Sequence, residues 1–114
     1  MKTSNQIFSP EALSHMLGGA ELTRQVVRVY SEELPGLLHK LSAAFQARDV
    51  RELGRLTHSL KGSLAMLAAH ESAELAASAS GQCLETGTIP DASLSELLGN
   101  LRQLELELQD FLTE

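Results

Sequence analysis

His58, Lys61 and Gly62 are the residues of this 114-residue chain whose types and spacing could do chemistry together. Residues three or four positions apart are neighbours on a helix surface, so a helix through this segment places the lysine and the glycine beside the histidine. A neutral imidazole is a nucleophile toward phosphorus, and an unperturbed pKa of about 6.5 leaves much of it neutral in the cytosol. An ammonium group beside it would offset the charge of a phosphoryl group. The spacing therefore indicates a histidine that can carry a phosphoryl group.

Small residues would keep the surface around this histidine low. Gly62 removes a side chain where another protein would approach, and Gly54 and Ala65 lie one turn before His58 and one turn after Lys61. Each interior glycine costs a helix about 1 kcal/mol relative to alanine. Two glycines in one helix therefore call for a packing or access reason, and we expect them to form an open strip.

The leucines of the same segment predict which way the histidine faces. Four of them recur at helical spacing on the side opposite His58, namely Leu56, Leu60, Leu64 and Leu67. An apolar stripe of this kind faces the core, so His58 should face water. The other histidines have no lysine and glycine at the same offsets: His15, His39 and His70.

Apolar periodicity along the whole chain predicts helices and no strand. The expected helices cover residues 10–17, 20–47, 50–68, 70–85 and 92–112. Four long amphipathic helices joined by short connections predict an all-α, up-down-up-down four-helix bundle. The short first helix would pack across one end or side of it. We expect residues 1–114 to form a single domain, because no linker divides them.

The expected helix starts rest on capping residues. Ser9 precedes Pro10, a pair that favours a helix start, and Asp49 is placed to cap the third helix. Either Asp91 or Ser93 could cap the last one.

The second helix has an interruption and a predicted apolar face. Pro35 should kink this helix rather than end it, although two helices broken near Leu34 are an alternative. The apolar positions expected to face inward are Leu22, Val26, Val29, Tyr30, Leu34, Leu37, Leu38, Leu41 and Phe45.

Composition and charge exclude several classes of protein. The formal net charge is -6, which argues against a general nucleic-acid binder. Residues 1–70 nevertheless contain eight basic residues against six acidic ones, and Arg51 and Arg55 lie near His58.

No apolar run approaches the roughly 20 residues of a membrane span, and the start of the sequence lacks the pattern of a signal peptide. Cys83 is the only cysteine, which excludes an internal disulfide. We therefore expect a soluble, cytoplasmic domain with no membrane contact.

The run from Thr57 to Met66, with His-Ser-Leu-Lys-Gly-Ser in its middle, resembles the signature of histidine-containing phosphotransfer (HPt) domains. Weaker similarity extends to residues 30–41, to Asp49 and to residues 83–85. The family commonly has a glycine about ten positions after its histidine, where this chain has Ala68. We expect that difference to change modestly where the third helix ends.

The resemblance implies a phosphorelay intermediate with no autokinase activity of its own. His58 would accept a phosphoryl group from the aspartyl phosphate of a response-regulator receiver domain and pass it to another receiver's aspartate. Lys61 would stabilise the phosphoryl charge, and Gly62 would give the partner access. The chain would need no cofactor of its own, because the receiver supplies Mg²⁺.

The resemblance also implies a docking surface for the receiver. Arg51 and Arg55 would dock or steer that acidic partner, beside the strip of Gly54 and Ala65. An apolar patch should contribute, either from Leu13, Met16 and Leu17 of the short first helix or from exposed positions of the second helix. We expect a monomer, because the helix that carries the histidine must stay open.

Two questions stay open from the sequence. The domain is either a free-standing shuttle or part of a hybrid sensor kinase. The alternative function is a non-phosphorylated helical interaction bundle, whose sequence would not need His58.

Overall fold

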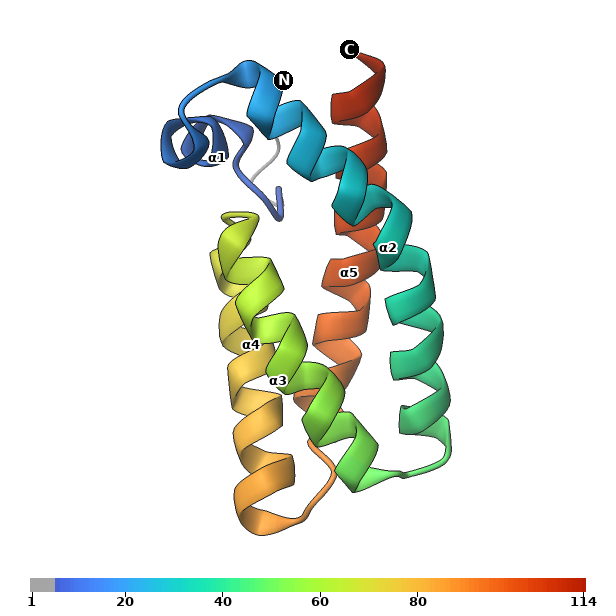
Figure 1. Cartoon of the computed structure of the whole chain (residues 1–114). Coiled ribbons are helices and arrows are strands. Elements are labelled where there is room, and N and C mark those ends of the chain that lie inside the picture. Colours follow the sequence, from blue (N-terminus) through green and yellow to red (C-terminus); the bar gives the residue numbers. More distant parts are fainter. Residues whose placement is uncertain (1–5) are drawn as a thin grey trace.

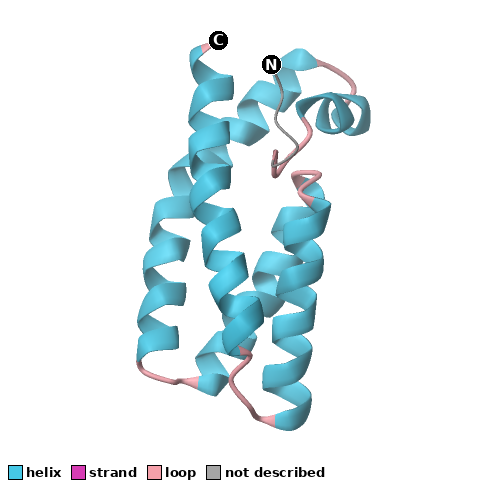
Figure 2. Cartoon of the chain, turned by 180° about the vertical axis from the view of Figure 1, so that it is seen from behind, coloured by secondary structure: helices cyan, strands magenta, loops and turns pink. Residues whose placement is uncertain are grey.

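The computed structural model describes residues 6–114, and within them it contains helices and no strand (Figure 1). The helices are α1 (Pro10–Leu17), α2 (Ala20–Gln46), α3 (Val50–Met66), α4 (His70–Gly81) and α5 (Asp91–Thr113), with a π-helical turn, η1 (Gln82–Thr86), directly after α4. Helices α2 to α5 run alternately up and down and form a bundle, and α1 lies across the end where α3 turns into α4. The connections within the bundle are short (Figure 2). The predicted all-α bundle with an accessory first helix is confirmed.

The helix starts agree with the capping predictions at two of three sites. The Ser9 hydroxyl accepts a hydrogen bond from the Ala12 N–H at 3.1 Å, and the Asp49 carboxylate accepts one from the Glu52 N–H at 3.1 Å. The prediction for α5 is wrong, since Pro90 is its N-cap and no side chain caps it. Asp91 is instead the first residue of α5, and its carboxylate binds Arg48 at 2.6 and 3.1 Å. This ion pair joins the connection between α2 and α3 to the start of α5.

Helix α2 runs through Pro35 without a break, so the two-helix alternative is wrong. Leu34 and Leu41 are buried on either side of the proline. Burial of a leucine side chain is worth about 1.5–3 kcal/mol, which is comparable with the cost of about 3 kcal/mol for an interior proline. Packing against the bundle therefore keeps the two halves of α2 in one helix.

The core of the bundle is largely leucine and alanine. The predicted inward positions of α2 are wrong near its start, where Leu22 and Val29 are 51% and 50% exposed. Thr23 and Val27 are buried in their place. The Thr23 hydroxyl donates to the Gly19 carbonyl at 2.7 Å, which satisfies its polar group inside the protein. A pattern of apolar residues alone could not identify this buried threonine.

Helices α3 and α4 end two or more residues before their predicted ends. Helix α3 ends at Met66, before the expected residue 68, and Ala68 has a left-handed φ of 59°. Such a conformation costs a residue with a Cβ roughly 1–2 kcal/mol, and it is a position that favours glycine. The regular part of α4 ends at Gly81, and the expected remainder forms the π-helical turn that Gly87 closes with a φ of 66°.

The segment that leads into α1 is attached to α5. The Glu107 carboxylate accepts hydrogen bonds from the N–H groups of Ile7, at 2.8 and 2.9 Å, and Phe8, at 3.2 Å. The Phe8 ring also packs edge-on against Phe111. These contacts, with the buried Leu13, fix α1 at the end of the bundle.

No helix within residues 6–114 has both the length and the apolar character needed to cross a membrane.

Candidate functional site

His58 lies on the solvent-exposed face of α3, near the middle of the helix. The residues two positions to either side, Leu56 and Leu60, are buried in the core. Leu64 and Leu67 are buried as well, so the predicted leucine stripe is confirmed. The imidazole is therefore held on a helix that the core fixes in place, and it is open to a partner.

The residues expected around the histidine mostly share its exposed face. Arg51, Arg55, Gly62 and Ala65 are exposed, whereas Lys61 is partly buried. A Cβ built on Gly62 would meet nothing within 4 Å. We call the five exposed residues of this face the His58 strip: Arg51, Arg55, His58, Gly62 and Ala65. The strip combines a nucleophile, positively charged side chains and two small residues that leave the histidine accessible.

Gly54 does not belong to the strip, which corrects the sequence-based expectation. It is buried, and a Cβ at this position would lie 2.8 Å from Cδ2 of Leu84 and 3.2 Å from Cβ of Cys83. Real Cβ atoms essentially never approach another heavy atom within 3.0 Å. The glycine therefore allows η1 to pack closely against α3, and it gives no open access to a partner.

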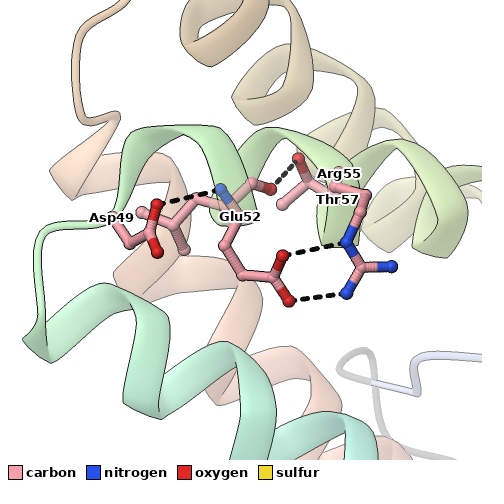
Figure 3. Close-up of polar contacts among 5 residues, drawn as sticks. Asp49, Glu52, Arg55 and Thr57 are labelled. Atoms are coloured by element: carbon pink, nitrogen blue, oxygen red, sulfur yellow. Dashed lines mark hydrogen bonds and ion pairs between the residues drawn. The ribbon is translucent and has the colours of Figure 1, made fainter.

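Arg55 is engaged within its own helix (Figure 3). Its guanidinium donates to both carboxylate oxygens of Glu52, at 2.9 and 2.5 Å. The hydrogen bonds from Arg55 lower the pKa of Glu52, and the same contact raises the pKa of Arg55. Both side chains are open to solvent, so the pair is screened by water. The positive charge of Arg55 is thus partly offset by the carboxylate of Glu52.

The hydroxyl groups that flank His58 lie on different sides of α3. Thr57 is buried, and its hydroxyl donates to the Leu53 carbonyl at 2.7 Å, as Figure 3 also shows. Ser59 is exposed. Because the Thr57 hydroxyl is bonded inside the helix, it is not available as a nucleophile beside the imidazole.

The apolar residues available to a partner differ from those expected on α1. Leu13 is fully buried and cannot take part, which corrects that expectation, whereas Met16 is exposed. Two further apolar residues are exposed that were not expected from the sequence: Met66, at the end of α3, and Leu84, in η1. The sequence spacing of Met66 and Leu84 does not distinguish them from core residues. Only the packing of the bundle shows that they face solvent.

Within residues 6–114, no three His, Cys, Asp or Glu side chains lie close enough together to hold a metal ion.

Comparison with known proteins gives one result. A family model described as "Hpt domain" matches residues 25–114, which include α3 and its histidine but not α1. The searches of curated proteins and of solved structures found no match to the chain.

Proposed function

Because the chain belongs to the Hpt domain family, we propose that His58 is its phosphoacceptor. Hpt domains act in histidine phosphotransfer and interact with receiver domains. In this proposal His58 takes a phosphoryl group from the aspartyl phosphate of one receiver and passes it to the aspartate of another. The observation that supports it best is the exposure of His58 on a helix whose opposite side is fixed in the core.

The transfer step uses one ring nitrogen of His58. Its lone pair forms the N–P bond while the P–O bond to the receiver's aspartate breaks, and the bonding electrons leave with the carboxylate. The proton on the other ring nitrogen stays, so the phosphorylated ring is a cation that can give up its phosphoryl group again. No redox change occurs. The second receiver reverses the step by attack of its aspartate on phosphorus.

Lys61 and Gly62 support this reaction in different ways. Lys61 lies one turn after His58, where its ammonium would attract the phosphoryl oxygens as they approach. Gly62 leaves open space at the position where the receiver must come close. Phosphoryl transfer depends mainly on positioning and charge stabilisation, and we propose that the receiver contributes the acidic pocket and Mg²⁺. The chain would then need no further catalytic group.

The test is transfer of phosphate from a receiver to the domain. Receiver domains phosphorylated with acetyl phosphate in the presence of Mg²⁺ would be mixed with the wild type, His58→Gln and His39→Gln. We expect acid-labile phosphate on the wild type and on His39→Gln, which removes an exposed histidine from α2. We expect none on His58→Gln. If the wild type binds receivers without taking up phosphate, the domain is an interaction bundle, and the relay function is wrong.

A further inference from the structure

Leu84 is exposed although it packs against α3. The residue is 60% exposed. A Cβ atom built on Gly54 would nevertheless lie only 2.8 Å from Cδ2 of Leu84. Its neighbour Cys83 is buried against the same glycine. One side of Leu84 therefore contacts α3, and the rest of the side chain faces solvent.

The position of Leu84 is set by the π-helical turn. The Thr86 hydroxyl donates to the Gln82 carbonyl at 2.6 Å, and the Gly87 N–H donates to the Cys83 carbonyl at 3.2 Å. Gly87 ends the turn in a left-handed conformation that a glycine adopts at no steric cost. These bonds and the buried Cys83 fix the backbone on both sides of Leu84. The leucine is thus held in place before any partner arrives.

The contact with Gly54 places Leu84 close to the His58 strip. Gly54 precedes His58 by four residues, which is one turn, or about 6 Å along the helix axis. A typical protein interface covers about 800 Å² on each partner, equivalent to a disc of roughly 16 Å radius. A partner centred on His58 would therefore cover Leu84 as well.

We propose that Leu84 is an apolar docking contact for the receiver domain, an inference that rests on the proposed function. The His58 strip offers charge, which favours encounter and orientation more than affinity. Side chains that become fully buried near the centre of an interface contribute most of the affinity, and this buried core is more apolar than the rim. Leu84 supplies such a side chain from η1. Gly54 acts as a positioning residue, because a Cβ at this position would collide with the Leu84 side chain.

Matched leucine variants test the contact. Leu84→Ala would be compared with Leu106→Ala, which truncates a leucine of α5 that is 58% exposed. We expect Leu84→Ala to raise the KM for the phosphorylated receiver about tenfold, the scale of an interface side chain that contributes to affinity. The kcat at saturating receiver should change less than about twofold, because the chemistry at His58 is intact. Leu106→Ala should change neither.

The outcomes separate this inference from the proposed function. If the wild type transfers phosphate and Leu84→Ala has an unchanged KM, the docking contact is wrong and the relay function stands. If the wild type does not transfer phosphate, both fail. Circular dichroism would confirm that each variant keeps its helices.

A second variant tests the positioning role of Gly54. Gly54→Ala should push the Leu84 side chain aside and raise the KM for the receiver. In the Leu84→Ala background, the same substitution should raise the KM much less, because the displaced atoms are gone. Equal effects of Gly54→Ala in both backgrounds would overturn the positioning role.

Discussion

Arg55 donates two hydrogen bonds to Glu52, three residues earlier in α3, at 2.9 and 2.5 Å. The pair lies on the exposed surface of the helix that carries His58. A carboxylate is therefore present among the basic residues that the sequence places around the histidine. The local charge is less positive than the count of arginines indicates, and the approach of an acidic receiver should depend on this pair.

The Glu52–Arg55 pair predicts opposite effects of two substitutions. Glu52→Gln removes a negative charge and frees Arg55, so association with a receiver should become about threefold faster at low salt, whereas Arg51→Gln should slow it by a similar factor. Stopped-flow measurements at low and high ionic strength would check this. Both effects should shrink as salt is added, because exposed charges are screened over about 8 Å at physiological ionic strength. Slower association of Glu52→Gln, or effects independent of salt, would contradict the prediction.

A larger side chain at Gly62 should stabilise the fold and at the same time slow phosphoryl transfer. A Cβ at this position meets nothing within 4 Å, so Gly62→Gln should keep the fold and gain roughly 0.5–1 kcal/mol in free energy of unfolding from better helix propensity. The longer side chain should obstruct the receiver and lower the rate of transfer. Gly99→Gln is the matched control, because Gly99 is an exposed glycine of α5 with equally open surroundings. It should gain similar stability in urea unfolding without losing transfer. Normal transfer by Gly62→Gln would show that access at this position is unimportant.

Gly54 and Gly62 show how far the sequence could predict the site. Both are glycines near His58 in one helix, and the sequence assigned both to an open strip. The exposure of His58 was predictable, because it depends only on the leucine spacing within α3. The role of Gly54 was not, because it depends on η1, which lies 30 residues further along the chain and packs against it.

Most of the fold, like the exposure of His58, could be predicted from the sequence. Helical periodicity identified the helices, and the capping residues Ser9 and Asp49 identified the starts of α1 and α3. The π-helical turn after α4 was not foreseen, because it continues the apolar pattern of a regular helix. Burial of Thr23 was also missed, since its hydroxyl is satisfied by a backbone carbonyl that only the folded helix provides.

The Arg48–Asp91 pair predicts how stability depends on pH. The hydrogen bonds from Arg48 hold the pKa of Asp91 below its usual value. A carboxylate with a lowered pKa in the folded state stabilises the fold above its unfolded pKa of about 4, and this contribution is lost as the pH falls through the folded-state value. Asp91→Asn should therefore be less stable than the wild type at neutral pH, and the difference should vanish in acid. Urea midpoints measured between neutral pH and strong acid would show it. A constant difference across that range would contradict the prediction.

The Asp49 cap predicts a loss of stability that leaves the phosphoryl site unchanged. Its carboxylate accepts the Glu52 N–H at the start of α3, two turns before His58. Asp49→Ala should lower the free energy of unfolding by about 1 kcal/mol, whereas Asp49→Ser should recover most of it. Urea unfolding followed by circular dichroism measures both. Equal stability of Asp49→Ala and the wild type would show that the cap contributes nothing.

Lys61 predicts an effect on transfer alone. Its side chain is partly buried beside the histidine, and hydrogen bonds to charged groups contribute about 1.5–3 kcal/mol. Solvent near the site favours the lower end of this range, so Lys61→Ala should slow transfer to and from His58 about tenfold. Lys61→Arg keeps the charge and should retain most of the rate. Single-turnover transfer from a phosphorylated receiver measures the rate, and circular dichroism should show an unchanged helix content. If Lys61→Ala transfers as fast as the wild type, the ammonium group does not stabilise the phosphoryl group, and His58 must rely on the receiver for that charge.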